Sequence, residues 1–160
     1  MDDVVPQLEE AFAKLKKELK LKTTLDQLDE IFFIRDFVRR ERFVSNSLSR
    51  QLCGRIVDTY NAWLGYLHGL VMPNTGNIIN MTEHQTLDDA EKTKLMTLMT
   101  ELMVFNNTNV LIGLTKDKKQ EAEFIDSAVT LWKETFLPTT VPILKELNAM
   151  WTRRANKNKE

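Results

Sequence analysis

The sequence contains few of the residues that break helices or cross-link small domains. Among 160 residues there are 5 glycines, 4 prolines and 1 cysteine, Cys53. A domain built only of β-strands needs many turns and normally uses more glycine and proline. A lone cysteine cannot form a disulfide within the chain, which fits a reducing compartment. These shortages favour a helical protein without disulfide bonds.

A strong net charge and long apolar runs are missing as well. The formal net charge is −1, so no overall field attracts nucleic acid or an anionic membrane. No apolar run is long enough to span a bilayer. Residues 1–10 are acidic, unlike the basic and then apolar start of a signal peptide. We therefore expect a soluble, cytoplasmic protein.

What remains is an ordinary globular composition with helical periodicity. Hydrophobic residues make up 42% and charged residues 28% of a chain about as long as one domain. In the first segment Asp2 or Asp3 can cap a helix, and apolar residues then recur at three- and four-residue steps. This apolar stripe consists of Val5, Leu8, Phe12, Leu15 and Leu19. It predicts an amphipathic helix over residues 3–20.

The same pattern predicts a bundle of further helices. Residues 25–72 contain no proline and are predicted to be helical, and a kink or short break can occur at two weak points, residues 45–47 and 53–54. A loop over 73–85 follows, and then helices over 87–114, from Asp117 to Pro138, and from Thr139 or Thr140 to about Trp151. Pro138 should either stop or bend the helix that reaches it. Short connections favour antiparallel neighbours. We predict an all-α, antiparallel up-and-down bundle of four long helices plus a short C-terminal helix, with one domain over 1–152 and a polar tail over 153–160.

The two longest predicted helices change from apolar to polar at the same level. If residues 73–85 connect them as a hairpin, the two helices are antiparallel and the inward-facing residues of one, its seam, pair with those of the other. The apolar end begins with Trp63 facing Leu95. At the other end the predicted pairs are Cys53 with Asn106, Ser49 with Asn109, and Asn46 with Gly113. Beyond Asn46 the seam continues to Arg42 and Arg39.

This polar level has two interpretations. A buried amide or hydroxyl left without a hydrogen bond lowers stability by about 1–3 kcal/mol. The level is therefore either solvated or held in register by bonds between its polar groups, or it forms a pocket between helices. Such a pocket would make the chain a small-anionic-ligand-binding protein or a transferase. The ligand hypothesis assigns binding to Asn46, Ser49, Cys53, Asn106, Asn109, Arg39 and Arg42.

Arginines also gather on residues 35–50, interrupted by Asp36 and Glu41. Arginine forks match phosphate geometry, so a nucleic-acid-binding face is one interpretation. A helix with this mixture of charges readily forms local ion pairs, and no helix-turn-helix or zinc-finger spacing is present. An ion-paired face is therefore favoured, and nucleic-acid binding is the weaker alternative.

The sequence contains no recognised catalytic or metal-binding motif. His68 and His84 do not form the Glu-x-x-His pattern of di-iron bundles, and Cys53 has no neighbouring base. No phosphate loop, dinucleotide fingerprint, nucleophile elbow or metalloprotease motif occurs. We expect no metal and no cofactor, and we favour a binding protein over an enzyme.

Large apolar side chains remain outside the main seam, and they suggest a partner. They are Phe33, Phe37, Phe43, Val44 and Leu48. We expect one four-helix core to leave part of this set uncovered, and an uncovered apolar patch indicates a binding surface. The resulting prediction is that the protein acts by protein–protein association, as a homo-oligomer or an adaptor.

Overall fold

The computed structural model describes residues 3–160, and every regular element in this range is a helix. In chain order these are α1 (Val5–Leu19), α2 (Leu25–Phe32), α3 (Ile34–Glu41), α4 (Leu48–Val71), α5 (Ile78–Thr86), α6 (Asp89–Thr115), α7 (Lys118–Leu131), the π-helix η1 (Trp132–Phe136) and α8 (Leu137–Lys157). The predicted all-α class is confirmed.

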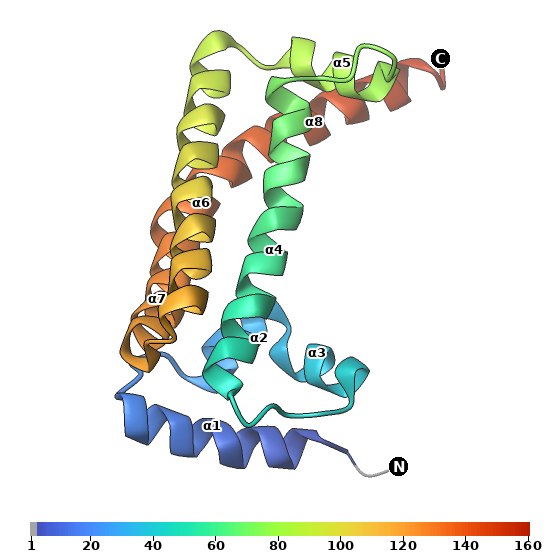
Figure 1. Cartoon of the computed structure of the whole chain (residues 1–160). Coiled ribbons are helices and arrows are strands. Elements are labelled where there is room, and N and C mark those ends of the chain that lie inside the picture. The colour runs from blue at the N-terminus through green and yellow to red at the C-terminus, as the bar shows by residue number, and fades with distance from the viewer. Residues whose placement is uncertain (1–2) are drawn as a thin grey trace.

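The long helices α4, α6 and α7 run side by side and alternate in direction (Figure 1). The helix α1 lies across the lower end of this group, where α2 and α3 also pack, and α5 lies at the opposite end. The chain turns away between α7 and α8, and α8 passes behind α4 to the C-terminus. Three long segments therefore stand together, and α1 crosses them instead of adding a fourth.

The long helix predicted over residues 25–72 is interrupted twice. Phe33 has φ 53° and joins α2 to α3, and Arg42 has φ 62° at the end of α3. The left-handed conformation costs roughly 1–2 kcal/mol for a residue other than glycine. At Phe33 it leaves that side chain 58% exposed, whereas both neighbours, Phe32 and Ile34, are fully buried. The weak point at residues 45–47 lies in the second break, but residues 53–54 lie inside α4.

Side-chain caps begin α2, α5, α6 and α7. Thr24 forms the predicted capping box with Gln27, and Asp117 accepts backbone hydrogen bonds at the start of α7 as predicted. Asp3 Oδ1 accepts from the backbone nitrogen of Val5, whereas Asp2 lies outside the described residues. The cap of α6 was predicted at Thr86 but is Asp88, which forms a capping box with Glu91. A further helix, α5, replaces most of the predicted loop, because Asn77 caps it.

Pro138 does not end the helix that begins at Lys118. The helix widens into the π-turn η1 immediately before Pro138 and continues through Pro142 to Lys157. Proline has no N–H, and its ring meets the carbonyl four residues earlier in a regular α-helix. A wider turn changes that spacing, and the helix bends there (Figure 1). Thr140 bonds back to the carbonyl of Phe136, so it does not cap a new helix as predicted.

The core is one cluster that extends from Leu8 to Leu147. Tyr60 is at its centre and is fully buried. Its ring lies 5.2–6.1 Å, centroid to centroid, from those of Phe32, Phe105, Trp132 and Phe136. Its hydroxyl donates to the carbonyl of Ala128 at 2.7 Å.

Across residues 3–160, no helix is both long and apolar enough to cross a membrane.

Candidate functional site

The polar level predicted on α4 is buried and meets α7 as well as α6. Ser49 and Cys53 are 2% and 0% exposed. The Ser49 hydroxyl donates to Glu121 Oε2 at 3.2 Å, and the Cys53 thiol points to the Glu121 carbonyl at 3.8 Å. Glu121 was not predicted as part of this level. It precedes Ile125 by four residues on the inward stripe of α7, so extending that stripe one turn would have found it.

The contact of this level with α6 is made by Arg50. Its Nη2 donates to the backbone carbonyl of Asn109 at 3.2 Å. Gly113 lies beside the same guanidinium, and a Cβ there would come within 3.1 Å of Nη2. Glycine therefore leaves room for the arginine. Within residues 3–160, Arg50 Nη1 and the Oδ1 atoms of Asn106 and Asn109 are buried without a hydrogen-bond partner.

The remaining predicted ligand residues are spread over three places. Asn106 is buried, and its amide donates to the side chain of Asn61 farther along α4, not to Cys53. Asn46 is exposed in the segment that precedes α4. Arg39 and Arg42 are exposed on α3 and at its end. The structure therefore brings together Ser49, Cys53 and Asn109 with Arg50 and Glu121. Asn46 lines a groove that also includes Ser49, whereas Arg39 and Arg42 are on α3 and at its end.

We expect Cys53 to resist thiol reagents in the folded protein. Burial, with a smaller contribution from the nearby Glu121 charge, raises the pKa of the Cys53 thiol to about 12. Since the thiolate is the reactive form, Ellman's reagent at pH 8 should label Cys53 only after unfolding in denaturant. Labelling of the native protein at the rate of free cysteine would contradict the buried position.

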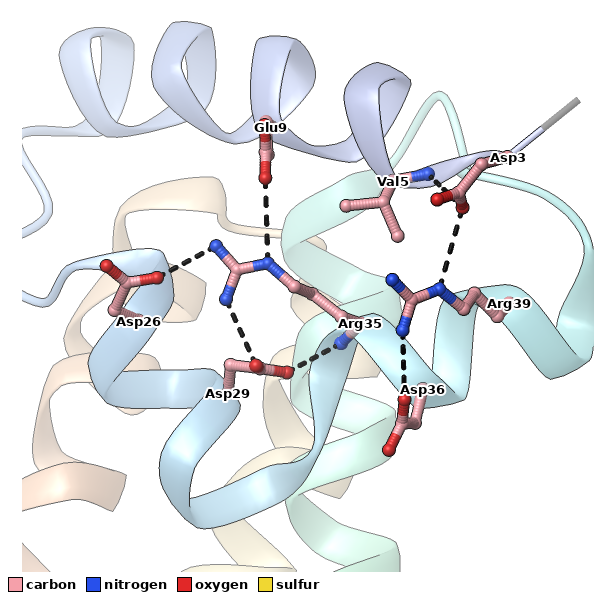
Figure 2. A network of polar contacts seen from close by, with 8 residues as sticks. All are labelled: Asp3, Val5, Glu9, Asp26, Asp29, Arg35, Asp36 and Arg39. Carbon is pink, nitrogen blue, oxygen red and sulfur yellow. Dashed lines mark hydrogen bonds and ion pairs between the residues drawn. The ribbon is translucent and has the colours of Figure 1, made fainter.

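Two arginines of the predicted face, Arg35 and Arg39, form ion pairs within the chain (Figure 2). Arg35 reaches Glu9 on α1 and Asp26 and Asp29 on α2, at distances of 3.6, 2.8 and 3.0 Å. Arg39 pairs with Asp3 and Asp36 at 3.6 and 3.1 Å. These contacts connect α1, α2 and α3, so they favour the ion-paired interpretation of this face over nucleic-acid binding.

An exposed apolar surface lies on α6, where no partner surface was predicted. Its outward face carries Met103, Val104, Asn107, Val110, Leu111 and Leu114, which we call the α6 ridge. Val104 and Leu111 are each 62% exposed, and Leu114 is 76% exposed. No charged residue occurs from Leu102 to Thr115. A surface helix normally presents charged and polar residues to water, whereas residues 102–115 of α6 carry mainly apolar side chains on both the inward and the outward face.

A groove flanks the α6 ridge on each side. The groove between α6 and α7 has a volume of about 860 Å³, and its lining includes Val104, Leu111 and Phe124. The groove between α4 and α6 has a volume of about 770 Å³, and its lining includes Met72, Met96, Met99 and Met103. Methionine adapts its shape to different partners. A ridge between two apolar grooves is a surface into which further helices can pack.

The apolar residues predicted to need a partner are only partly exposed. Phe33 and Phe43 are 58% and 52% exposed. Phe37 and Val44 pack against the core, and Leu48 is buried. Other exposed apolar side chains, including Met72, Ile78 and Ile79, lie outside α6. The α6 ridge differs from them because it is an exposed apolar stripe in a segment without charged residues. Among residues 3–160, no three His, Cys, Asp or Glu side chains gather in a way that could hold a metal ion.

Comparison of the chain with known protein families, with curated protein sequences and with solved structures finds no match. The α6 ridge and the polar level of α4, α6 and α7 are therefore interpreted from their own chemistry.

Proposed function

We propose that this protein acts by binding another protein surface through the α6 ridge. The observation that carries the proposal is the uncharged, exposed outer face of α6 over Leu102–Thr115. Contiguous apolar patches of this kind mark interaction sites on soluble proteins. Such a role needs no catalytic residue.

The energetics favour a covered ridge. Transfer of apolar surface out of water stabilises by roughly 25 cal/mol for each Å². Val104, Leu111 and Leu114 each expose more than half of their surface, so covering each one contributes about 1–2 kcal/mol. The flanking grooves add further apolar area, since their walls include Phe124 and Met99. A partner helix that lies along α6 would bury the ridge and one groove together.

The proposal is tested by a photoreactive benzophenone amino acid placed at Leu111 of the full chain. A matched variant carries the same group at Lys145, which is exposed on α8. Irradiation in cells that produce the chain is expected to give one discrete cross-linked product from position 111 and none from position 145. The product should disappear when Leu114→Asp is added, because a buried unpaired charge opposes association. Equal products from both positions, or none from position 111, would refute the proposal.

A further inference from the structure

Methionines gather in the groove between α4 and α6, which we call the methionine groove. The chain has 7 methionines, and its groove-lining members are Met72, Met96, Met99 and Met103. His68 lines the groove as well. Core filling does not account for this set, because Met72, Met96 and Met103 are 65%, 55% and 46% exposed. Their thioether sulfurs are therefore accessible to a ligand that enters the groove.

The side chains of this groove come from one face of each helix. Met96, Met99 and Met103 are three and four residues apart, so they share one face of α6. His68 is in the last turn of α4, and Met72 follows it by four residues, directly after the end of that helix. The sulfurs and the imidazole therefore enter the same groove from two helices.

The hydrogen bond between Asn61 and Asn106 fixes which levels of α4 and α6 meet. The two helices run in opposite directions (Figure 1). His68 follows Asn61 by seven residues, and Met99 precedes Asn106 by seven residues. Both are therefore about 10.5 Å beyond this bond, at the same level of the groove.

Met72 and Met96 form a second level one helical turn farther from that bond. Met72 is eleven residues after Asn61, and Met96 is ten residues before Asn106. Gly65 also lines the groove, and a Cβ built there would meet nothing within 4 Å. The groove is therefore open beside these two levels, and the flexible methionine side chains can turn toward an ion between the helices.

We propose that the methionine groove binds a soft monovalent metal ion, Cu(I). Thioether sulfur selects Cu(I) among the biological metal ions, and imidazole is also a copper ligand. Within residues 3–160, the residues that line this groove include no carboxylate, the ligand that Ca²⁺ and Mg²⁺ prefer. The site is independent of the association proposed for the α6 ridge. It departs from the expectation of no metal, which was based on the histidines and the cysteine of the sequence.

Competition between the full chain and the Cu(I)–bicinchoninate complex, without oxygen, tests the site. The unmodified chain is expected to take up a single Cu(I). A double variant, Met96→Leu with Met99→Leu, should bind Cu(I) at least about tenfold more weakly, since it removes two ligands. Leucine and methionine are similar in volume, so circular dichroism should show unchanged helix content.

The matched control is a second double variant, Met81→Leu with Met150→Leu. These methionines are on α5 and α8 and do not line the groove. Their replacement should leave the affinity for Cu(I) unchanged. The proposal is overturned if the unmodified chain takes up no Cu(I), or if the two double variants bind it equally well.

Two further variants show where the ion is held. Cys53 carries the thiol of the chain and is buried, so Cys53→Ala should retain the affinity for Cu(I). Leu114→Asp, which should abolish the photo-cross-link, lies outside the methionine groove and should also retain it. Loss of Cu(I) binding in either variant would overturn the metal site. Loss of the photo-cross-link with Cu(I) binding intact would instead leave the metal site standing, so the two proposals fail separately.

Discussion

Tyr60→Ala is expected to lower the free energy of unfolding by about 3–5 kcal/mol, the usual cost of removing a large aromatic side chain from a core. Tyr60 is fully buried and contacts aromatic rings contributed by α2, α6 and η1. Its removal therefore leaves a cavity among these rings, and a packed core relaxes only partially into such a space. Urea unfolding followed by circular dichroism should show a lower midpoint with a similar slope.

Tyr60→Phe is the matched control for this loss. It keeps the ring contacts and removes only the hydroxyl that donates to the Ala128 carbonyl. That carbonyl also accepts the backbone N–H of Trp132, so it is not left unsatisfied. We expect a loss of about 1 kcal/mol. Equal losses from Tyr60→Phe and Tyr60→Ala would show that the hydrogen bond, and not the packing of the ring, stabilises this centre.

Asp126→Ala should also destabilise the fold strongly, with a loss of about 3 kcal/mol in the free energy of unfolding. Asp126 on α7 accepts three hydrogen bonds from the turn between α1 and α2. Its Oδ2 accepts from the backbone nitrogen of Lys22 at 3.1 Å, and its Oδ1 accepts from the backbone nitrogen and hydroxyl of Thr23 at 3.0 and 2.6 Å. Without the carboxylate these donors lose their partners and the attachment of α1 weakens. Denaturant unfolding measures the loss.

Asp126→Asn and Thr23→Ala distinguish the bonds within this contact. Asparagine keeps one acceptor oxygen but turns an N–H group toward other donors. The loss of stability from Asp126→Asn should therefore be more than half of the loss from Asp126→Ala. Thr23→Ala removes only the hydroxyl bond and should cost about 1–2 kcal/mol. If Asp126→Ala costs no more than Thr23→Ala, the two backbone bonds contribute nothing to stability.

Local signals in the sequence predicted much of the fold. The apolar stripe of α1, the capping box of Thr24 and the cap at Asp117 depend on residues only three or four positions apart. The break at Phe33 has no such signal, since phenylalanine rarely adopts a left-handed conformation. It follows from the burial of Phe32 and Ile34 on either side. Tertiary packing therefore interrupts the helix at Phe33, although the local sequence favours a continuous helix.

The candidate sites show the same limit. Pairing the inward-facing residues of two predicted helices correctly indicated that four polar residues are buried. They are Ser49, Cys53, Asn106 and Asn109. The two helices could not reveal Glu121, because a third helix supplies it. The exposed face of α6 was missed for a different reason. Its apolar residues are spread around the helix, so periodicity alone does not indicate which of them face water.

The hydrogen bonds of Asp126 also bear on the order in which the chain folds during synthesis. Lys22 and Thr23 bond to a residue 104 and 103 positions later in the sequence. The ribosome adds roughly 5–20 residues per second, so α1 emerges about 5–20 s before its anchor on α7 exists. During that interval its apolar stripe, including Leu8 and Phe12, has no α7 to pack against. The first helix to be made is therefore among the last to reach its final position, and this delay is when a nascent chain would most need protection from aggregation.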